Sequence, residues 1–221
     1  MPGMDMADMA GMVMPRADGW SPVDVTLLFL MWVVMMAAMM TPSAAPMILT
    51  FLTVNRRRGA AGRPVVSSWM FLLGYLVVWA AFSAVATAAQ WWMHEAAALS
   101  PGMALVSPVS GGAVLFAAGI FQWTPLKRAC LSHCRSPLSF VMAEWRDGTW
   151  GAFRMGLGHG VYCVGCCWIL MALLFVVGVM NLLWVAAIGA FVMVEKIAPH
   201  GDVAGRVAGV ALSVAGVWLF L

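Results

Sequence analysis

The sequence predicts an all-α fold, a polytopic transmembrane helical bundle of about six spans with both termini outside. Of its 221 residues, 63% are hydrophobic and only 10% are charged. A soluble domain of ordinary composition carries about 25% charged residues, so this chain is expected to lie in a lipid bilayer. The net charge of +3 is too small to indicate a nucleic-acid partner, and membrane topology explains the basic residues better.

The first span is predicted over about residues 22–52. Ser21 is a suitable N-cap and Asp24 can complete a capping box, which marks where the helix begins. Pro42 and Pro46 lie within the same apolar run. Because proline has no amide hydrogen, we expect these two residues to kink or end the helix.

Five further apolar stretches approach the length of about 20 residues that a helix needs to cross a bilayer. The stretch near 103–124 contains the run PVSGG (108–112), which is expected to interrupt its helix. Spans four and five are separated only by a short turn near 178–181, so they should pack as a tight antiparallel hairpin. The five spans are predicted over about 65–90, 103–124, 152–178, 180–198 and 203–221.

The lysines and arginines orient these spans, because basic residues accumulate in cytoplasmic loops. With six spans, the loops after spans one, three and five share one side, and only Arg16 lies on the other side. Both termini therefore face outward, and the expected location is the bacterial inner membrane, as a multi-pass protein. The basic residues of the cytoplasmic side are Arg56, Arg57, Arg58, Arg63, Lys127, Arg128, Arg135, Arg146, Arg154, Lys196 and Arg206.

Residues 1–21 are predicted to form a methionine-rich, disordered periplasmic tail ahead of a single transmembrane domain over 22–221. The run MPGMDMADMAGMVM consists mostly of methionines and small residues, which cannot build a core alone. Thioether sulfurs are soft ligands that suit Cu(I). The tail is therefore expected to gather Cu(I) outside the membrane.

A stripe of soft ligands is predicted on the fourth span. At about 100° per residue, His159, Cys163, Cys166 and Cys167 fall on one face of the helix, and Met155 shares it. Imidazole and thiolate ligands suit Cu(I) or Zn(II), and such groups inside a membrane are usually functional. Cys166 and Cys167 diverge by about 100°, so one of the two is expected to ligate. The alternative is that these cysteines are small hydrophobic core residues.

A second cluster lies in the run KRACLSHCR, where Cys130, His133 and Cys134 are spaced to share one face of a short helix. These residues could take up or release a metal ion at the cytoplasmic mouth. The alternative is an amphipathic juxtamembrane helix whose basic residues contact anionic lipid. Whether this cluster forms one site with Cys163 or a separate site stays open.

Further candidate ligands lie on spans five and one. Glu195 is expected level with His159, where it could complete a metal site or accept a proton from a thiol. The alternative is that Glu195 pairs with a basic loop residue while Lys196 extends to the membrane interface. Met35 and Met39 stack on one face of the first span and are candidate Cu(I) ligands, although methionine is also a common filler of helix contacts.

These patterns favour an integral membrane protein that binds, transports or delivers a soft metal, with Cu(I) as the expected ion and zinc as the alternative. The chain has no phosphate-binding loop, no dinucleotide fingerprint and no Ser-His-Asp pattern, so an enzyme is not predicted. The expected partners are the metal ion, the lipid bilayer and subunits of a membrane complex, without nucleic acid. Two alternatives are a structural or assembly subunit of such a complex and a thiol oxidoreductase that uses Cys163 and Cys166.

Several separated runs carry a family resemblance: MMAAMMTPSAAPM (35–47), QWTPLKRACLSHCRSP (122–137), GHGVYCVGCCWILM (158–171) and GVMNLLW (178–184), with the pair Glu195 and Lys196. Together they resemble a bacterial family of predicted metal-binding integral membrane proteins, a domain of unknown function. The resemblance covers about residues 25–200. It implies a helical membrane fold and a metal role for these motif positions, Asn181 included, and it implies no particular substrate.

Overall fold

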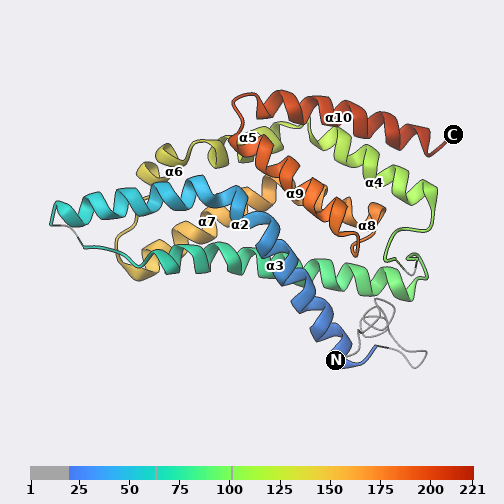
Figure 1. The fold of residues 1–221 in the computed structure, drawn as a ribbon, viewed down its shortest axis with the longest axis horizontal. Coiled ribbons are helices and arrows are strands. Elements are labelled where there is room, and N and C mark those ends of the chain that lie inside the picture. Colours follow the sequence, from blue (N-terminus) through green and yellow to red (C-terminus); the bar gives the residue numbers. More distant parts are fainter. Residues whose placement is uncertain (1–19, 63, 101) are drawn as a thin grey trace, which may run out of the picture.

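The computed structural model describes residues 20–62, 64–100 and 102–221, and in this part of the chain the regular structure is helical, which confirms the all-α prediction. Almost all of the predicted methionine-rich tail, residues 1–19, lies outside the described residues. The helices are α2 (Pro22–Ala60), α3 (Ser68–Glu95), α4 (Pro108–Phe121), α5 (Pro125–Arg135), α6 (Pro137–Ala143), α7 (Gly148–Ala172), α8 (Leu174–Val177), α9 (Leu182–Ile197) and α10 (Gly201–Trp218) (Figure 1).

Helix α2 begins as the sequence predicted. The Ser21 hydroxyl accepts a hydrogen bond from the Asp24 amide at 3.2 Å, and the Asp24 carboxylate accepts one from the Ser21 amide at 2.9 Å. Pro42 and Pro46 lie inside the helix, which continues through them for 39 residues and changes direction along its length (Figure 1). The prolines therefore kink the helix without ending it, because each removes only one hydrogen bond of the ladder.

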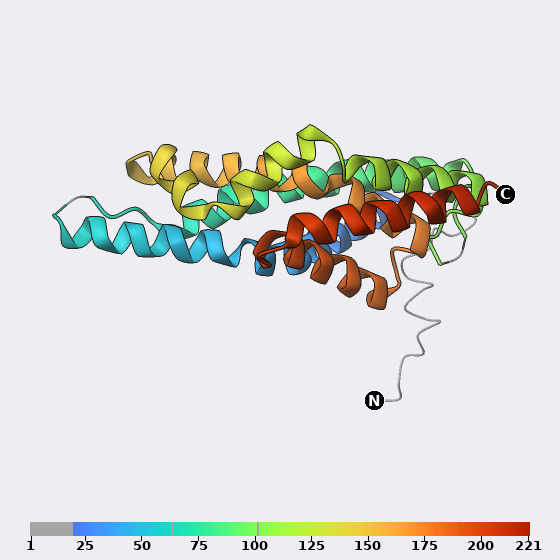
Figure 2. The same ribbon diagram turned by 90° about the horizontal axis from the view of Figure 1, so that it is seen from above.

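Helices α3 and α7 make the most extensive contact of any helix pair in the described chain, and glycines allow their close approach. A Cβ atom on Gly156 of α7 would collide with the carbonyl oxygen of Phe71, and one on Gly74 of α3 would collide with that of Phe153. Small residues let two helix backbones approach closely in this way. Figures 1 and 2 show that α3, α7 and the second half of α2 run along the long axis of the molecule.

The third predicted span begins later than expected. The run PVSGG forms the first turns of α4 and does not interrupt it, because Pro108 occupies a first-turn position, where its missing amide hydrogen costs nothing. Helix α4 then packs on α10, where a Cβ on Gly119 would stand 2.7 Å from the carbonyl oxygen of Gly209. These two helices lie side by side in both ribbon views (Figures 1 and 2).

Spans four and five do not form the tight hairpin that the sequence predicted. The chain leaves α7 through the four-residue α8 and turns at Gly178, whose φ of +91° lies in the region that favours glycine. Helix α9 then packs more extensively on α2 than on α7. The short α8 and this turn displace α9 from the α7 surface.

Three helical stretches of the described chain are long and apolar enough to cross a membrane: α2, α3 and the continuous stretch Gly148–Val177 formed by α7 and α8. Helices α4 and α5 are bent by 64° relative to each other and together make a fourth candidate. Helices α9 and α10 have 16 and 18 residues and do not meet the same criterion. The fold therefore holds three to four candidate spans, fewer than the six predicted.

Candidate metal centre

The predicted stripe on α7 forms a continuous buried row. Met155, His159, Cys163 and Cys167 follow one another at intervals of four residues, and each side chain is at most 3% exposed. Cys166 lies beside the row and is 1% exposed. The glycine contacts between α3 and α7 bring this face of the helix into the centre of the bundle, where water is excluded.

Cys163 lies where four helices converge. Its sulfur accepts a hydrogen bond from the ammonium group of Lys196 on α9 at 2.8 Å and lies 3.2 Å from the hydroxyl of Tyr75 on α3. The same ammonium group donates to the hydroxyl of Ser43 on α2 at 3.1 Å, and the Tyr75 hydroxyl donates to the Met40 carbonyl at 3.0 Å. The Cys163 sulfur therefore contacts polar side chains from two other helices, α3 and α9.

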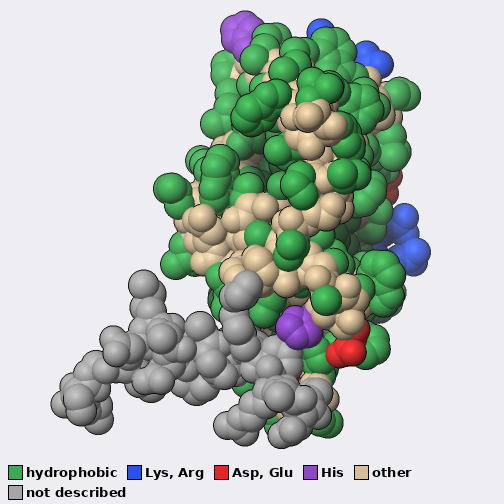
Figure 3. Space-filling model, turned by 90° about the vertical axis from the view of Figure 1, so that its right-hand side faces the viewer, with side chains coloured by type: hydrophobic (Ala, Val, Ile, Leu, Met, Phe, Trp, Pro, Cys, Tyr) green, Lys and Arg blue, Asp and Glu red, His purple; other side chains and the backbone are tan. Residues whose placement is uncertain are grey.

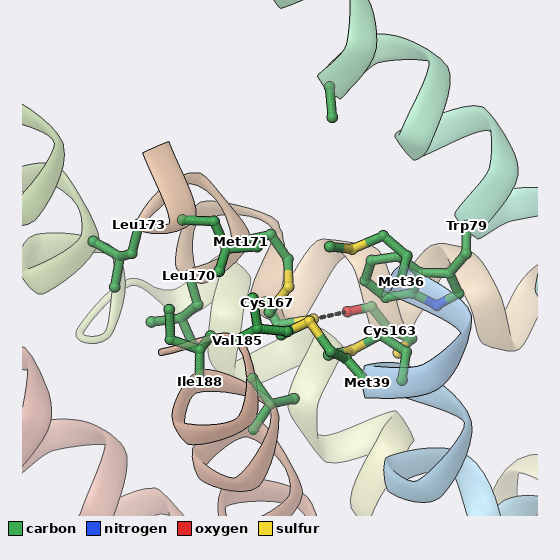
Figure 4. Packing of buried hydrophobic residues seen from close by; sticks show 14 of the residues in the cluster. Met36, Met39, Trp79, Cys163, Cys167, Leu170, Met171, Leu173, Val185 and Ile188 are labelled. Atoms are coloured by element: carbon green, nitrogen blue, oxygen red, sulfur yellow. Dashed lines mark hydrogen bonds between the residues drawn. The ribbon is translucent and has the colours of Figure 1, made fainter. Parts of the chain in front are cut away.

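The two neighbouring thiols of α7 bond to their own helix. Cys167 donates to the carbonyl oxygen of Cys163 at 2.9 Å (Figure 4). Cys166 donates to the same oxygen at 3.1 Å. Thiols are weak donors, so these bonds are easily exchanged for a metal–sulfur bond when the side chains rotate.

Methionines complete a sulfur-rich environment around these cysteines. Figure 4 shows Met36 and Met39 of α2 and Met171 of α7 beside Cys163 and Cys167. Met39 also packs against Gly189 of α9. Met35 is half-buried and packs on the edge of the same core. The sulfur cluster comprises Met36, Met39, Cys163, Cys166, Cys167 and Met171, all buried in one hydrophobic core.

His159 lies one turn from Cys163 and is 3% exposed. Its ring stacks on Tyr75, with centroids 5.5 Å apart and planes inclined by 23°, and its Nδ1 atom has no hydrogen-bond partner in the described structure. A buried polar nitrogen without a partner is costly, and a soft metal ion is one partner that would satisfy it.

The three predicted ligands of helix α5 differ in burial: the two thiols pack into the bundle and the imidazole is exposed. Cys134 is buried in the same core as Cys166, and half-buried Cys130 packs against Gly165 of α7. His133 is exposed and stacks on Tyr162 with centroids 4.2 Å apart. The thiols of Cys130 and Cys134 therefore lie next to the α7 thiols, whereas the exposed imidazole of His133 does not.

Glu195 and Lys196 are both buried, and they face in different directions. The Lys127 ammonium group donates to the Glu195 carboxylate at 2.6 Å and also to the side-chain oxygen of Gln122. Arg135 donates to the backbone carbonyl of Glu195 at 2.9 Å. The alternative in which Lys196 reaches the membrane interface is wrong, because Cys163 and Ser43 hold its ammonium group inside the bundle.

In the described part of the chain, no three histidine, cysteine, aspartate or glutamate side chains converge on one point that could hold a metal ion. A bound ion would therefore need the α7 thiols to rotate out of their hydrogen bonds, or the thioethers to supply ligands. Cu(I) is compatible with both conditions, because it accepts thiolate and thioether sulfur.

Sequence reasoning missed the partners of Cys163, which are Tyr75 and the inward-facing Lys196, and it missed Ser43, which accepts a hydrogen bond from Lys196. One composition signal was available for two of them. The chain has only two tyrosines and two lysines, and Tyr75, Lys127 and Lys196 are all buried. Every other basic residue except the histidines is an arginine, so rarity is what sets these residues apart in the sequence, whereas their burial is known from the structure.

Comparison with known protein families matches residues 29–219 to a family model described as a copper chaperone (PpoB2). The match runs from α2 to α10 and includes every residue of the sulfur cluster. It supports the metal-binding role that the soft ligands predicted, with copper as the metal. No curated protein and no solved structure matches the chain. Because the family match spans most of the sequence, the protein belongs to the PpoB2 family of copper chaperones.

Proposed function

We propose that this protein is an integral membrane copper chaperone that holds Cu(I) in the sulfur cluster between α2 and α7 and delivers it to an acceptor. The observation that carries this proposal is the environment of Cys163, a fully buried thiol that receives a hydrogen bond from Lys196 amid further thiols and thioethers. Soft sulfur ligands favour Cu(I), and exclusion of water protects the bound ion from exchange and oxidation.

The charge of Lys196 fits a copper–thiolate complex. Two thiolates that bind one Cu(I) ion carry a net charge of −1, which is expensive to place in an apolar interior without a partner. Lys196 is buried and makes no salt bridge with a carboxylate in the described structure, whereas Lys127 is paired with Glu195. We propose that Lys196 supplies the balancing positive charge beside the copper ligands.

Membrane insertion is part of the proposal. Its support is the set of three to four long apolar helices and the mainly hydrophobic surface seen from one end of the molecule (Figure 3). Valines are exposed along α10, at positions 203, 207, 210, 214 and 217, where they could contact lipid. We propose a six-span arrangement in a bacterial inner membrane, in which the α4–α5 pair, α9 and α10 act as the shorter spans.

The burial of the thiols weighs against a thiol oxidoreductase. Cys163 and Cys166 are at most 1% exposed, whereas thiol–disulfide exchange requires that a partner thiolate reach the sulfur atom. The copper chaperone family also suggests a non-enzymatic role.

The decisive experiment measures copper and zinc per chain by elemental mass spectrometry, after purification without chelators and loading with Cu(I). We expect about one copper per wild-type chain and a large loss in the Cys163→Ser/Cys167→Ser variant, because serine oxygen is a poor ligand for a soft ion. The matched control is Cys130→Ser, which removes a half-buried thiol outside the sulfur cluster. Full copper retention by the double variant would reject the proposed site, and zinc in place of copper would reject the proposed ion.

A further inference from the structure

The row of soft ligands on α7 extends beyond the sulfur cluster toward the first turns of the helix. Met155 lies 12 residues before Cys167, which corresponds to about 18 Å along the helix at 1.5 Å per residue. His159 and Cys163 occupy the two intermediate positions, and all four side chains are buried. A soft ion could therefore move along this face from one sulfur or nitrogen ligand to the next.

A cavity of about 190 Å³ lies at the Met155 end of this row. Glu144, Arg146 and Arg154 are exposed, so the cavity opens at the surface. Phe140 separates it from the imidazole of His159, with ring centroids 5.8 Å apart. We call this space the Met155 cavity; its lining residues are Phe140, Glu144, Arg146, Arg154, Met155, Gly158 and Tyr162.

The rim of the Met155 cavity carries an excess of positive charge. Arg146 approaches Glu144 at 3.9 Å, whereas Arg154 makes no salt bridge in the described structure. The two guanidinium groups therefore exceed the single carboxylate by one charge. The Arg146 amide also donates to the Met155 sulfur at 3.4 Å, which places a soft atom beside the basic rim.

We infer that the Met155 cavity is a docking site for a small anionic thiol that carries Cu(I), and that copper passes between this carrier and Met155. This inference rests on the proposed copper function. Guanidinium groups recognise carboxylates by charge-assisted hydrogen bonds, and the thioether accepts the ion. The cavity is smaller than drug-sized pockets of about 300 Å³ or more, so it fits the thiol-bearing part of a small molecule.

The transfer is a ligand exchange without oxidation or reduction. A bond forms between Cu(I) and the Met155 sulfur while the bond between Cu(I) and the carrier sulfur breaks, and the carrier leaves as a thiolate that water can protonate. The ion remains Cu(I) throughout. His159 and Cys163 are the next ligands along the same helix face.

The test compares two Cu(I) donors, glutathione and its glycine monoethyl ester, which share one thiol and differ by one negative charge. Copper loading of the full-length protein is followed by stopped flow, in uncharged detergent micelles at low ionic strength. We expect faster loading from glutathione by roughly tenfold, because basic rims steer anions. In Arg146→Gln/Arg154→Gln this ratio should fall toward one. The matched control is Arg56→Gln/Arg57→Gln, which removes two exposed arginines that do not line the cavity.

Each outcome has one meaning. A wild-type ratio near one, or an equal ratio in the cavity variant, overturns the docking site while leaving the copper site intact. Failure of the wild type to load copper from either donor rejects the proposed function instead. If added phosphatidylglycerol abolishes the glutathione preference, the arginines bind lipid headgroups and the inference is also overturned.

Discussion

At the scale of single residues, the two lysines of the chain have different kinds of partner. Lys127 pairs with Glu195, and Lys196 contacts Cys163 and Ser43. Both ammonium groups are buried, so each needs a partner to offset its lost hydration. For Lys127 the partner is a carboxylate, which makes the pair structural. For Lys196 the partner is a candidate copper ligand, which links the lysine to the proposed function.

The two lysines should therefore respond differently to replacement by methionine. Lys196→Met removes a charged hydrogen bond worth about 1.5–3 kcal/mol, so we expect Cu(I) affinity to fall by roughly tenfold to a hundredfold. A competition titration with a chromophoric Cu(I) chelator measures this change. Lys127→Met is the matched control, because it also removes a buried ammonium group but one that bonds to Glu195 and not to Cys163. Its expected effect is a loss of stability of about 3–5 kcal/mol, because Glu195 is left buried and unpaired. Equal copper affinity in Lys196→Met and the wild type would refute the charge-balancing role.

At the scale of helices, the contact between α3 and α7 positions the site. Gly74 and Gly156 let the two backbones meet, and this contact brings Tyr75 within reach of Cys163. A larger side chain at either glycine would separate the helices and move the Tyr75 hydroxyl away from the thiol. The geometry of the candidate metal centre thus depends on glycines, which supply no ligand.

Gly156→Ala should destabilise the protein by about 1–3 kcal/mol, because the new methyl group would collide with the Phe71 carbonyl. Thermal unfolding in detergent, followed by circular dichroism, would measure the loss. Gly158→Ala is the matched control on the same helix, since its Cβ would meet only the Phe140 ring, at an ordinary contact distance of 3.9 Å. If both variants unfold at the same temperature, close backbone approach does not limit the stability of the bundle.

At the scale of the whole molecule, the ends of the bundle differ in charge. The arginines that end α2 lie at the same end as the start of α7, while the start of α2 and the C-terminus lie away from it (Figures 1 and 2). The proposed orientation places the arginine-rich end in the cytoplasm. The Met155 cavity, beside the start of α7, would then face cytoplasmic thiols.

This orientation predicts which end a membrane-impermeant maleimide labels in intact spheroplasts. In a Cys130→Ser background, which removes the half-buried native thiol, Leu221→Cys should react from outside. Arg57→Cys should react only after the membrane is opened. The reverse pattern would invert the topology, and labelling of both positions in sealed spheroplasts would contradict a membrane-spanning arrangement.

The sequence by itself determined the helical class, the capping box at Ser21 and the single helix face shared by His159 and Cys163. These features are local, because composition, capping and the helical repeat depend on near neighbours in the chain. Only the tertiary structure decided that Tyr75 and Lys196 contact Cys163, that Ser43 accepts a hydrogen bond from Lys196, and that Lys127 pairs with Glu195. Such contacts depend on how helices distant in sequence pack, and helical periodicity gives the face of each helix without naming the helix that it meets.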